Sequence, residues 1–343
     1  MLWNIPIENL EERYSSQWNV WFPQEFQKAN LEFQTIYPDN FQKNKINIGS
    51  FLDVYSSNRF KALQLSMICQ LFEDNKVKDD DIFFFHDLWF PGIEMLFYIR
   101  DGSGIKFKIM GCLHAGTYDP WDFLTQSGMM EWAARIETSW FNEVDKIFVA
   151  TYFHKDLILE NRKILESKIA ITNFPLFLDI EYDKDEKEDI IIFPHRMNKE
   201  KQPELFIKLK EQFKNKYPAW KFLFTKEECK TKEEYYSLLK KAKVAVSFAQ
   251  QETWGIAQQE AMFLGCIPVV PNRLSYHEMY YGCFKYNTLS GVYTLVESYM
   301  NNYSKVINDS SAWGFKRNLS KLKENNRQSI PNMILYFKGV IND

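Results

Sequence analysis

Short hydrophobic runs alternate with longer amphipathic stretches along most of the chain. In the first half, β-rich runs at 81–85, 107–113 and 146–150 each end at polar or loop-forming residues. From residue 190 onward the pattern predicts strands at 190–193, 221–225, 244–248 and 267–270, with helices at 203–217, 232–242 and 256–264. This alternation is typical of parallel α/β layers, in which ligands bind beyond the carboxyl ends of the strands.

A charged stretch divides the two alternating regions. Residues 179–189 read Asp-Ile-Glu-Tyr-Asp-Lys-Asp-Glu-Lys-Glu-Asp and offer little to bury. We therefore predict an N-terminal domain at 1–180 and a C-terminal domain at 181–312. The remaining residues, 313–343, form a predicted helical tail that could cross back to the first domain.

Composition excludes several classes of protein. The 343 residues are 45% hydrophobic and 17% aromatic, which excludes disorder as the main state. Lys plus Arg number 42 against 45 Asp plus Glu, so no chain-wide basic field is available to hold a polyanion. The apolar runs are too short for a membrane helix, and the N-terminus lacks a signal-like core, so we expect a cytoplasmic protein. The cysteines show no C-x-x-C spacing, and neither G-x-G-x-x-G nor a P-loop motif is present.

The segment from 247 to 261 carries the most chemical information. A strand ends near Phe248, a loop presents Glu252, and Gly255 opens a helix that carries Glu260. The free amides and positive dipole end of a helix N-terminus attract phosphate, and carboxylates accept hydrogen bonds from sugar hydroxyls. A diphosphate joined to a sugar suits this pattern. The alternative is a favourable helix start at Glu252 and a solvated helix position at Glu260.

The spacing of Glu252 and Glu260, followed by Gly265-Cys266-Ile267-Pro268, resembles the donor-sugar motif of retaining glycosyltransferases with the GT-B fold. That resemblance implies an α/β fold of two Rossmann-like, doubly wound domains facing each other across a cleft. It also implies that Arg196 and Lys201 hold a diphosphate, where a planar fork and a mobile charge stabilise the leaving group. The alternative for both is a surface charge at a strand end.

The same resemblance assigns the remaining donor residues. Glu252 accepts sugar hydroxyls, Glu260 accepts the ribose hydroxyls, and the segment Thr253, Trp254, Gly255 and Ile256 adds anion-binding amides. His114, at the end of a first-half strand, approaches the sugar or the acceptor, so the implied catalytic set is His114, Arg196, Lys201 and Glu252. The implied co-substrate is a UDP- or GDP-sugar, with no prosthetic group and no metal.

Two narrower resemblances concern the acceptor. Residues 190–285, with Pro194-His195-Arg196 and Lys232-Glu233-Glu234-Tyr235-Tyr236, resemble the C-terminal domain of tRNA-queuosine mannosyltransferases. The opening at 10–15 and the block from Asp87 to Asp122 look similar to glycosyltransferases encoded by bacteriophages, some of which decorate hydroxymethylated pyrimidines in DNA. The glycine-rich loop that GT-B enzymes usually carry after the first strand is absent near Ile5-Pro6-Ile7.

Polar and aromatic residues of the first half are candidates for acceptor binding: His86, Asp87, Trp89, Tyr118 and Trp121. Aromatic faces stack on bases and sugars. Three alternatives stay open: His86, Asp87, His114, Asp119 and Asp122 could hold a metal ion, the histidines could be buried core residues, and the aromatics could be core residues. Lys43, Lys45, Arg59 and Lys61 could touch phosphates or simply form an exposed helix face.

The sequence thus predicts a nucleotide-sugar-dependent, retaining glycosyltransferase whose preferred acceptor is a hydroxymethylated base in phage DNA. The alternatives are a saccharide, a lipid, a small molecule or a modified tRNA base as acceptor, and a catalytically silent nucleic-acid-binding module. The expected partners are the nucleotide sugar and a nucleic acid, with no membrane and no obligate protein partner.

Overall fold

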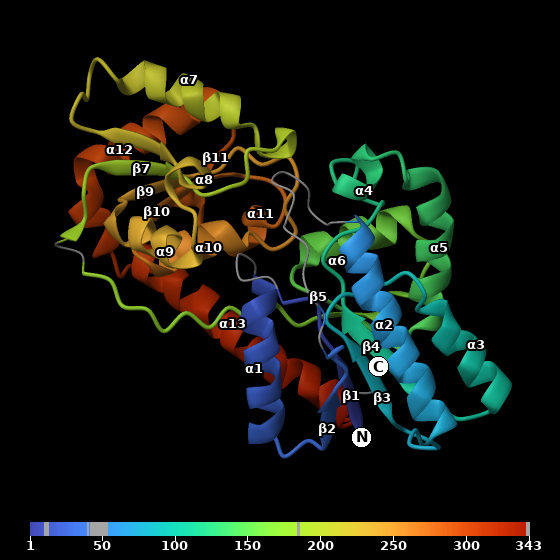
Figure 1. The fold of residues 1–343 in the computed structure, drawn as a ribbon. Helices are drawn as coiled ribbons and strands as arrows, with labels where there is room; N and C mark the ends of the chain where they lie inside the picture. Colours follow the sequence, from blue (N-terminus) through green and yellow to red (C-terminus); the bar gives the residue numbers. More distant parts are fainter. Residues whose placement is uncertain (10–13, 40, 42–53, 184–185, 341–343) are drawn as a thin grey trace. The chain divides into compact units, whose positions relative to one another are not determined.

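The protein is seen here as a computed structural model that describes residues 1–9, 14–39, 41, 54–183 and 186–340. It contains two compact units, one of Met1–Pro175 with Gln328–Asp343 and one of Leu176–Arg327. Each unit has a parallel sheet with helices around it (Figure 1). The charged stretch that the sequence analysis used as a boundary lies just inside the second unit, and the predicted tail is shared between the units.

The first unit is built on a six-stranded sheet in the order β2-β1-β3-β4-β5-β6, with every neighbouring pair parallel. Its strands are β1 (Leu2–Ile5), β2 (Phe33–Thr35), β3 (Ile82–Phe85), β4 (Lys108–Cys112), β5 (Lys146–Val149) and β6 (Ile169–Ile171). Its helices are α1 (Tyr14–Lys28), α2 (Val54–Glu73), α3 (Glu94–Ser103), α4 (Phe123–Gln126), α5 (Met130–Glu143), α6 (Tyr152–Asn161) and the short η1 (Glu166–Lys168).

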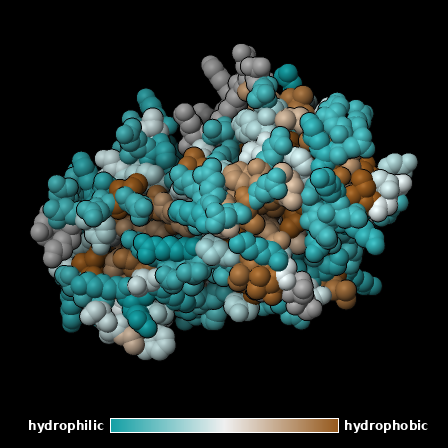
Figure 2. Space-filling view, turned by 90° about the horizontal axis from the view of Figure 1, so that it is seen from below, coloured by the Kyte–Doolittle hydropathy of each residue, from teal (hydrophilic) through white to brown (hydrophobic). Residues whose placement is uncertain are grey.

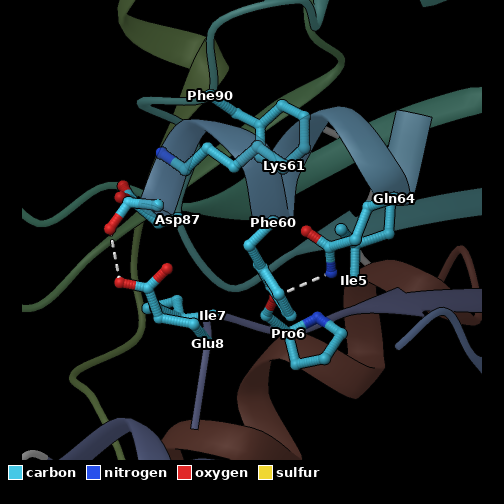
Figure 3. A pocket seen from close by; sticks show the side chains of 10 residues that line it. Ile5, Pro6, Ile7, Glu8, Phe60, Lys61, Gln64, Asp87 and Phe90 are labelled. Atoms are coloured by element: carbon cyan, nitrogen blue, oxygen red, sulfur yellow. Dashed lines mark hydrogen bonds between the residues drawn. The ribbon is translucent and has the colours of Figure 1, made fainter. Parts of the chain in front are cut away.

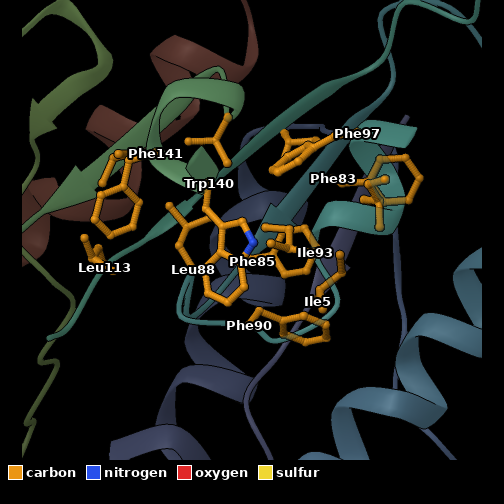
Figure 4. Packing of buried hydrophobic residues seen from close by; sticks show 14 of the residues in the cluster. Ile5, Phe83, Phe85, Leu88, Phe90, Ile93, Phe97, Leu113, Trp140 and Phe141 are labelled. Carbon is orange, nitrogen blue, oxygen red and sulfur yellow. The ribbon is translucent and has the colours of Figure 1, made fainter. Parts of the chain in front are cut away.

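Alternate residues of β3 serve the two faces of this sheet, as strand geometry requires. Phe83 and Phe85 belong to a large hydrophobic cluster that includes Leu65 and Ile68 of α2, Leu96 of α3 and Trp140 of α5 (Figure 4). On the other face, Phe84 contacts Phe337, which also packs on Phe26 and Phe148. A sheet buried on both faces explains why its strands read as continuous apolar runs.

The second unit is built on a five-stranded sheet in the order β11-β10-β9-β7-β8, also parallel. Its strands are β7 (Ile190–Phe193), β8 (Lys221–Phe224), β9 (Val244–Val246), β10 (Ile267–Pro271) and β11 (Lys285–Tyr286). Its helices are η3 (Lys199–Lys201), α7 (Pro203–Phe213), α8 (Thr225–Glu228), α9 (Lys232–Lys241), α10 (Ile256–Phe263), α11 (Tyr276–Met279), η4 (Gly282–Phe284) and α12 (Leu289–Ile307). Helix α13 (Phe315–Phe337) begins in this unit and ends in the first.

The surface seen in Figure 2 is mostly hydrophilic, with hydrophobic residues in small groups. Among the residues that the structure describes, no helix combines the length and the hydrophobicity needed to span a bilayer.

Candidate functional site

The predicted donor residues meet at the switch point of the second sheet. The chain runs from β7 to β8 on one side and then to β9 on the other, so the segments after β7 and β9 leave the same edge side by side. The backbone N–H of Gln250 donates to the carbonyl oxygen of Glu200 at 2.7 Å and joins these two segments. In open α/β sheets this is the position at which ligands bind.

Lys201 and Glu252 form a buried ion pair across this edge. The Lys201 ammonium lies 3.3 Å from Glu252 Oε2, and the two side chains are 6% and 16% exposed. The ammonium also donates to the carbonyl oxygen of Gln251. Burial by itself raises the pKa of Glu252, but Lys201, His195 and two backbone amides together bring the pKa below its ordinary value. Glu252 is therefore held as a carboxylate.

Glu252 also accepts hydrogen bonds from the backbone just before helix α10. Its Oε1 accepts from the backbone N–H of Gly255 at 2.8 Å and of Trp254 at 3.4 Å. The sequence analysis expected these amides to bind an anion, but in this structure Glu252 already accepts their hydrogen bonds. The amides left for an anion are those of the first turn of α10, which begins at Ile256 and whose amides have no intrahelical acceptor. Gly255 has φ +67°, and a Cβ there would lie 2.7 Å from Tyr276 Cε1, so the turn requires glycine.

His195 lies near this ion pair as a neutral imidazole. It is 5% exposed, and burial together with the positive charge of Lys201 lowers its pKa to about 3. The amide nitrogen of Gln258, on α10, lies 3.4 Å from His195 Nε2. Thus the segment after β7 contacts Glu252 through a charged group and helix α10 through a neutral one.

Arg196, unlike Lys201 and His195, is exposed. Its guanidinium lies 3.4 Å from Glu200 Oε1, and its side chain is 44% exposed. An exposed ion pair of this kind contributes roughly 0.2–1 kcal/mol to stability. The exposure of this guanidinium suits a role toward a ligand.

Glu260 lies on α10 with its carboxylate hydrogen-bonded to α9. Its Oε1 accepts from the ammonium of Lys232 at 2.6 Å and from the hydroxyl of Tyr236 at 2.9 Å. Burial raises the pKa of Tyr235, on the same helix α9, and a side-chain hydrogen bond with Glu260 also contributes to that rise. At 3% exposure, Glu260 is not the solvated helix position of the alternative interpretation. The sequence analysis did not identify Lys232 and Tyr236 as partners of Glu260, although their spacing of four residues places them on one face of a helix.

The two histidines predicted on the acceptor side are packed among aromatic rings of the first unit. His86 is fully buried, and its Nε2 lies 2.8 Å from Asn4 Oδ1. Burial, with a contribution from His114, lowers its pKa to about 3. His114 is half-buried against Trp18, and its Nε2 lies 2.7 Å from the carbonyl oxygen of His86. His86 thus matches the alternative of a core histidine.

Of the three predicted stacking aromatics, two are fixed by internal contacts. Tyr118 is 3% exposed, and its hydroxyl lies 2.6 Å from His154 Nε2, so its ring offers no free face in this structure. Trp89 donates from Nε1 to Glu137 Oε1 at 2.9 Å. Trp121 is half-buried, and its backbone N–H donates to Asp119 at 2.9 Å. Among the three, Trp121 has the ring that the described internal contacts engage least.

Glu137, which the sequence analysis missed, is a buried carboxylate that links several side chains of this region by hydrogen bonds. Glu137 is fully buried and accepts from Trp89, from the backbone and side chain of Thr117, and from Arg162 at 2.6 Å. The only sign of this role in the sequence is that Glu137 falls on the apolar face of a helix.

The metal alternative finds no support in the described residues, which contain no group of three potential ligands placed to hold a metal ion. Asp122 instead caps α4 by accepting from the backbone N–H of Leu124 at 2.9 Å. Burial raises the pKa of Asp122 to about 7. Residues 10–13, Lys43 and Lys45, named in the sequence analysis, lie outside the described residues.

The fold is that of the GT-B glycosyltransferases. Sucrose-phosphate synthase from Thermosynechococcus elongatus matches 99% of this chain and 98% of its own with a TM-score of 0.70 at 9% identity. The catalytic domain of starch synthase IV from Arabidopsis thaliana, solved with ADP and acarbose, matches 96% of this chain and 99% of its own with a TM-score of 0.62 at 11% identity. TarM of S. aureus, solved with UDP, matches 80% of this chain and 58% of its own with a TM-score of 0.57 at 16% identity.

A relative is also found by sequence. The tRNA-queuosine α-mannosyltransferase of Drosophila melanogaster is 31% identical over 129 residues, which cover 31% of this chain and 34% of the relative. The match thus spans about a third of each protein. No family model matches the chain.

Proposed function

We propose that the protein is a glycosyltransferase that uses a nucleotide sugar as donor. The observation that carries the proposal is the buried pair of Lys201 and Glu252 at the start of α10, at the ligand-binding edge of the second sheet. The GT-B fold and the glycosyltransferases found by comparison support it.

Each charged group has a distinct role in this proposal. Arg196 and Lys201, with the first-turn amides of α10, bind the diphosphate and stabilise its charge as it leaves. Glu252 accepts hydrogen bonds from the sugar hydroxyls. Glu260 accepts from the ribose hydroxyls, while Lys232 and Tyr236 hold its carboxylate in place.

We propose transfer with retention of configuration. The acceptor oxygen bonds to the anomeric carbon on the face from which the diphosphate departs, the bond between that carbon and the phosphate oxygen breaks, and a phosphate oxygen takes the acceptor's proton. None of these steps needs a side-chain nucleophile. His114 stays a candidate for contact with the sugar or the acceptor.

The acceptor is a hydroxyl group. The resemblance to phage enzymes favours a hydroxymethylated base in DNA, and the similarity to a tRNA-queuosine mannosyltransferase favours a tRNA base. A saccharide, a lipid or a small molecule is the remaining alternative as acceptor.

The direct test is to incubate the protein with UDP-, GDP- and ADP-sugars and to measure released nucleoside diphosphate. Addition of DNA with hydroxymethylated bases, of tRNA or of simple glycosides should raise the release for one acceptor class. Glu252→Gln should lower turnover more than it lowers binding of the nucleoside diphosphate, because the sugar is absent from that product. Release of no nucleoside diphosphate from any sugar, with no nucleotide binding, would contradict the proposal.

A further inference from the structure

Lys187 connects the ends of two helices of the second unit. It belongs to the charged stretch that the sequence analysis expected to bury little, yet its side chain is half-buried. Its ammonium donates to the carbonyl oxygens of Leu239 and Ala242, at the end of α9, at 3.0 and 2.7 Å. It also donates to the carbonyl oxygen of Leu264, at the end of α10, at 2.6 Å. The three donors of one ammonium are thus matched by three acceptors from two helix ends.

Helix ends are where such a donor has the most to offer. The last carbonyl groups of an α-helix have no intrahelical partner, and a cation is favoured at this end of the helix dipole. The Sγ of Cys266 lies 3.2 and 3.3 Å from the carbonyl oxygens of Leu239 and Ala242, but a thiol is a weak donor. Lys187 supplies a charged donor to both helix ends at once.

Further contacts attach the same stretch to the two helices. The ammonium of Lys187 lies 5.1 Å from the centre of the Tyr182 ring. That ring lies against Gly265, where a Cβ would come within 2.3 Å of Tyr182 Cε2. The backbone N–H of Glu188 donates to the carbonyl oxygen of Lys241 at 2.8 Å. The position of Lys187 is therefore fixed by the segment on both sides of it.

The same two helices meet again one turn away, at Glu260. On α10, Glu260 lies one turn before the carbonyl group that Lys187 binds, and on α9 Tyr236 lies one turn before the other two. Glu260 Oε1 accepts from Lys232 and Tyr236 of α9. Lys187 and Glu260 thus bridge α9 and α10 at two successive levels.

The level at Lys187 limits how far α9 can slide along α10. Residues of both helices belong to one hydrophobic cluster, but hydrophobic contacts are non-directional and fix no register. Hydrogen bonds hold only over a narrow range of distance and angle, so an ammonium with three acceptors does fix one. Without Lys187 the helices could shift, and the carboxylate of Glu260 would no longer be held at one position.

We propose that Lys187 is a positioning residue for recognition of the nucleotide: by fixing α9 against α10 it holds Glu260 where its carboxylate accepts from the ribose hydroxyls. The proposal rests on the proposed function, in which Glu260 contacts the ribose. It adds a residue that lies outside the donor motif and acts without touching the nucleotide.

The test compares the affinity for UDP and GDP with the affinity for their 2′,3′-dideoxy analogues, measured by calorimetry. The ratio of the two affinities reports on the ribose hydroxyls alone, because base and diphosphate are the same in both. We expect a ratio of about tenfold or more for the unaltered protein, since a carboxylate accepts from these hydroxyls. Lys187→Met should lower that ratio by about threefold or more. Partial unfolding would lower both affinities alike and leave the ratio unchanged.

Glu260→Gln separates this proposal from the proposed function. In a Glu260→Gln background, Lys187→Met should not lower the ratio further, because Lys187 acts through Glu260. If Glu260→Gln lowers the ratio and Lys187→Met does not, the positioning role is wrong and the ribose role of Glu260 stands. If Glu260→Gln itself leaves the ratio unchanged, the ribose role is wrong and the positioning role falls with it.

Lys61→Met is the matched control. Lys61 lies on α2 of the first unit, where its ammonium donates to the carbonyl oxygen of Trp89 at 2.6 Å and lies 5.4 Å from the centre of the Phe90 ring (Figure 3). Burial lowers its pKa, as it does for Lys187. The control removes a half-buried ammonium from outside the second unit, so the ratio should stay that of the unaltered protein. An equal fall in the ratio for Lys61→Met would overturn the proposal.

A milder change covers the case in which Lys187→Met does not fold. Lys187→Gln keeps N–H donors but is shorter and uncharged, so it should also lower the ratio. An unchanged ratio in folded Lys187→Gln would count against the positioning role.

Discussion

Replacement of Lys201 by methionine should damage both the stability of the second unit and nucleotide binding. Methionine fills a similar volume but leaves Glu252 Oε2 without its cation, and that carboxylate is 16% exposed. Breaking one side of a buried ion pair costs roughly 3–5 kcal/mol. Because Glu252 keeps its two backbone donors, we expect the lower end, a loss of about 3 kcal/mol.

The same change should raise the pKa of Glu252, since burial raises that pKa and Lys201 is the largest influence that lowers it. The double variant Lys201→Met/Glu252→Gln removes both charges and should recover part of the lost stability. The measurement is guanidinium denaturation of the single and double variants, with Lys199→Met, an exposed lysine of the same short helix η3, as control.

Nucleotide affinity gives the second readout. Loss of a charge-assisted hydrogen bond to a diphosphate costs roughly 1.5–3 kcal/mol, so calorimetry should show UDP or GDP binding weakened by ~10-fold or more. A destabilisation below about 1 kcal/mol for Lys201→Met would refute the buried ion pair. Unchanged nucleotide affinity in a folded Lys201→Met variant would refute the diphosphate role.

Three further changes test other parts of the structure. Arg196→Ala should leave the unfolding free energy within about 1 kcal/mol but weaken nucleotide binding ~10-fold, because its ion pair is exposed; calorimetry showing full affinity would remove Arg196 from the site. Gly255→Ala should lower the unfolding free energy by roughly 1–3 kcal/mol, because the residue has φ +67° and lies close to Tyr276. The control Gly102→Ala, in α3 with open space around it, should be neutral or stabilising by up to about 1 kcal/mol. Thermal melts that show equal losses for the two variants would contradict this reasoning. The pKa of Asp122 is about 7 in the folded state and ordinarily 3.8, so between pH 4 and 7 the unfolded state binds fewer protons and stability falls as pH rises. Asp122→Asn keeps the cap and should gain roughly 4 kcal/mol at pH 8 over its effect at pH 4. Parallel pH profiles of unfolding for the two proteins would refute the shift.

Periodicity alone located much of the framework. The predicted strands at 81–85, 107–113 and 146–150 correspond to β3, β4 and β5, and the predicted helix at 232–242 corresponds to α9 at Lys232–Lys241. The helix predicted at 203–217 ends at Phe213 instead, and turns at 214–216 and 218–219 lead into β8. Apolar spacing identifies which residues are buried, but the end of a helix depends on local hydrogen bonds that leave little trace in that spacing.

Side-chain placement was less predictable on the acceptor side. His86 lies at a strand end, as expected, and Tyr118 lies in the loop after β4, but both side chains are directed into the packed unit. Position at a strand end determines the edge on which a residue lies, and not whether its side chain faces solvent or the core. The pairing of Lys201 with Glu252, 51 residues apart, was accessible only through a family resemblance, because nothing local in the sequence brings them together.

Helix α13 has a consequence for the order in which the protein can be made. Its residues from Gln328 onward belong to the first unit but follow the whole second unit along the chain. Phe337 covers Phe84 and Phe148 on one face of the first sheet. During synthesis the part of that face under Phe337 stays uncovered until the ribosome has finished the second unit, although Phe22 and Phe26 of α1 already pack on Phe84. The first unit to be translated is therefore the last to be completed, and both units share one late folding step.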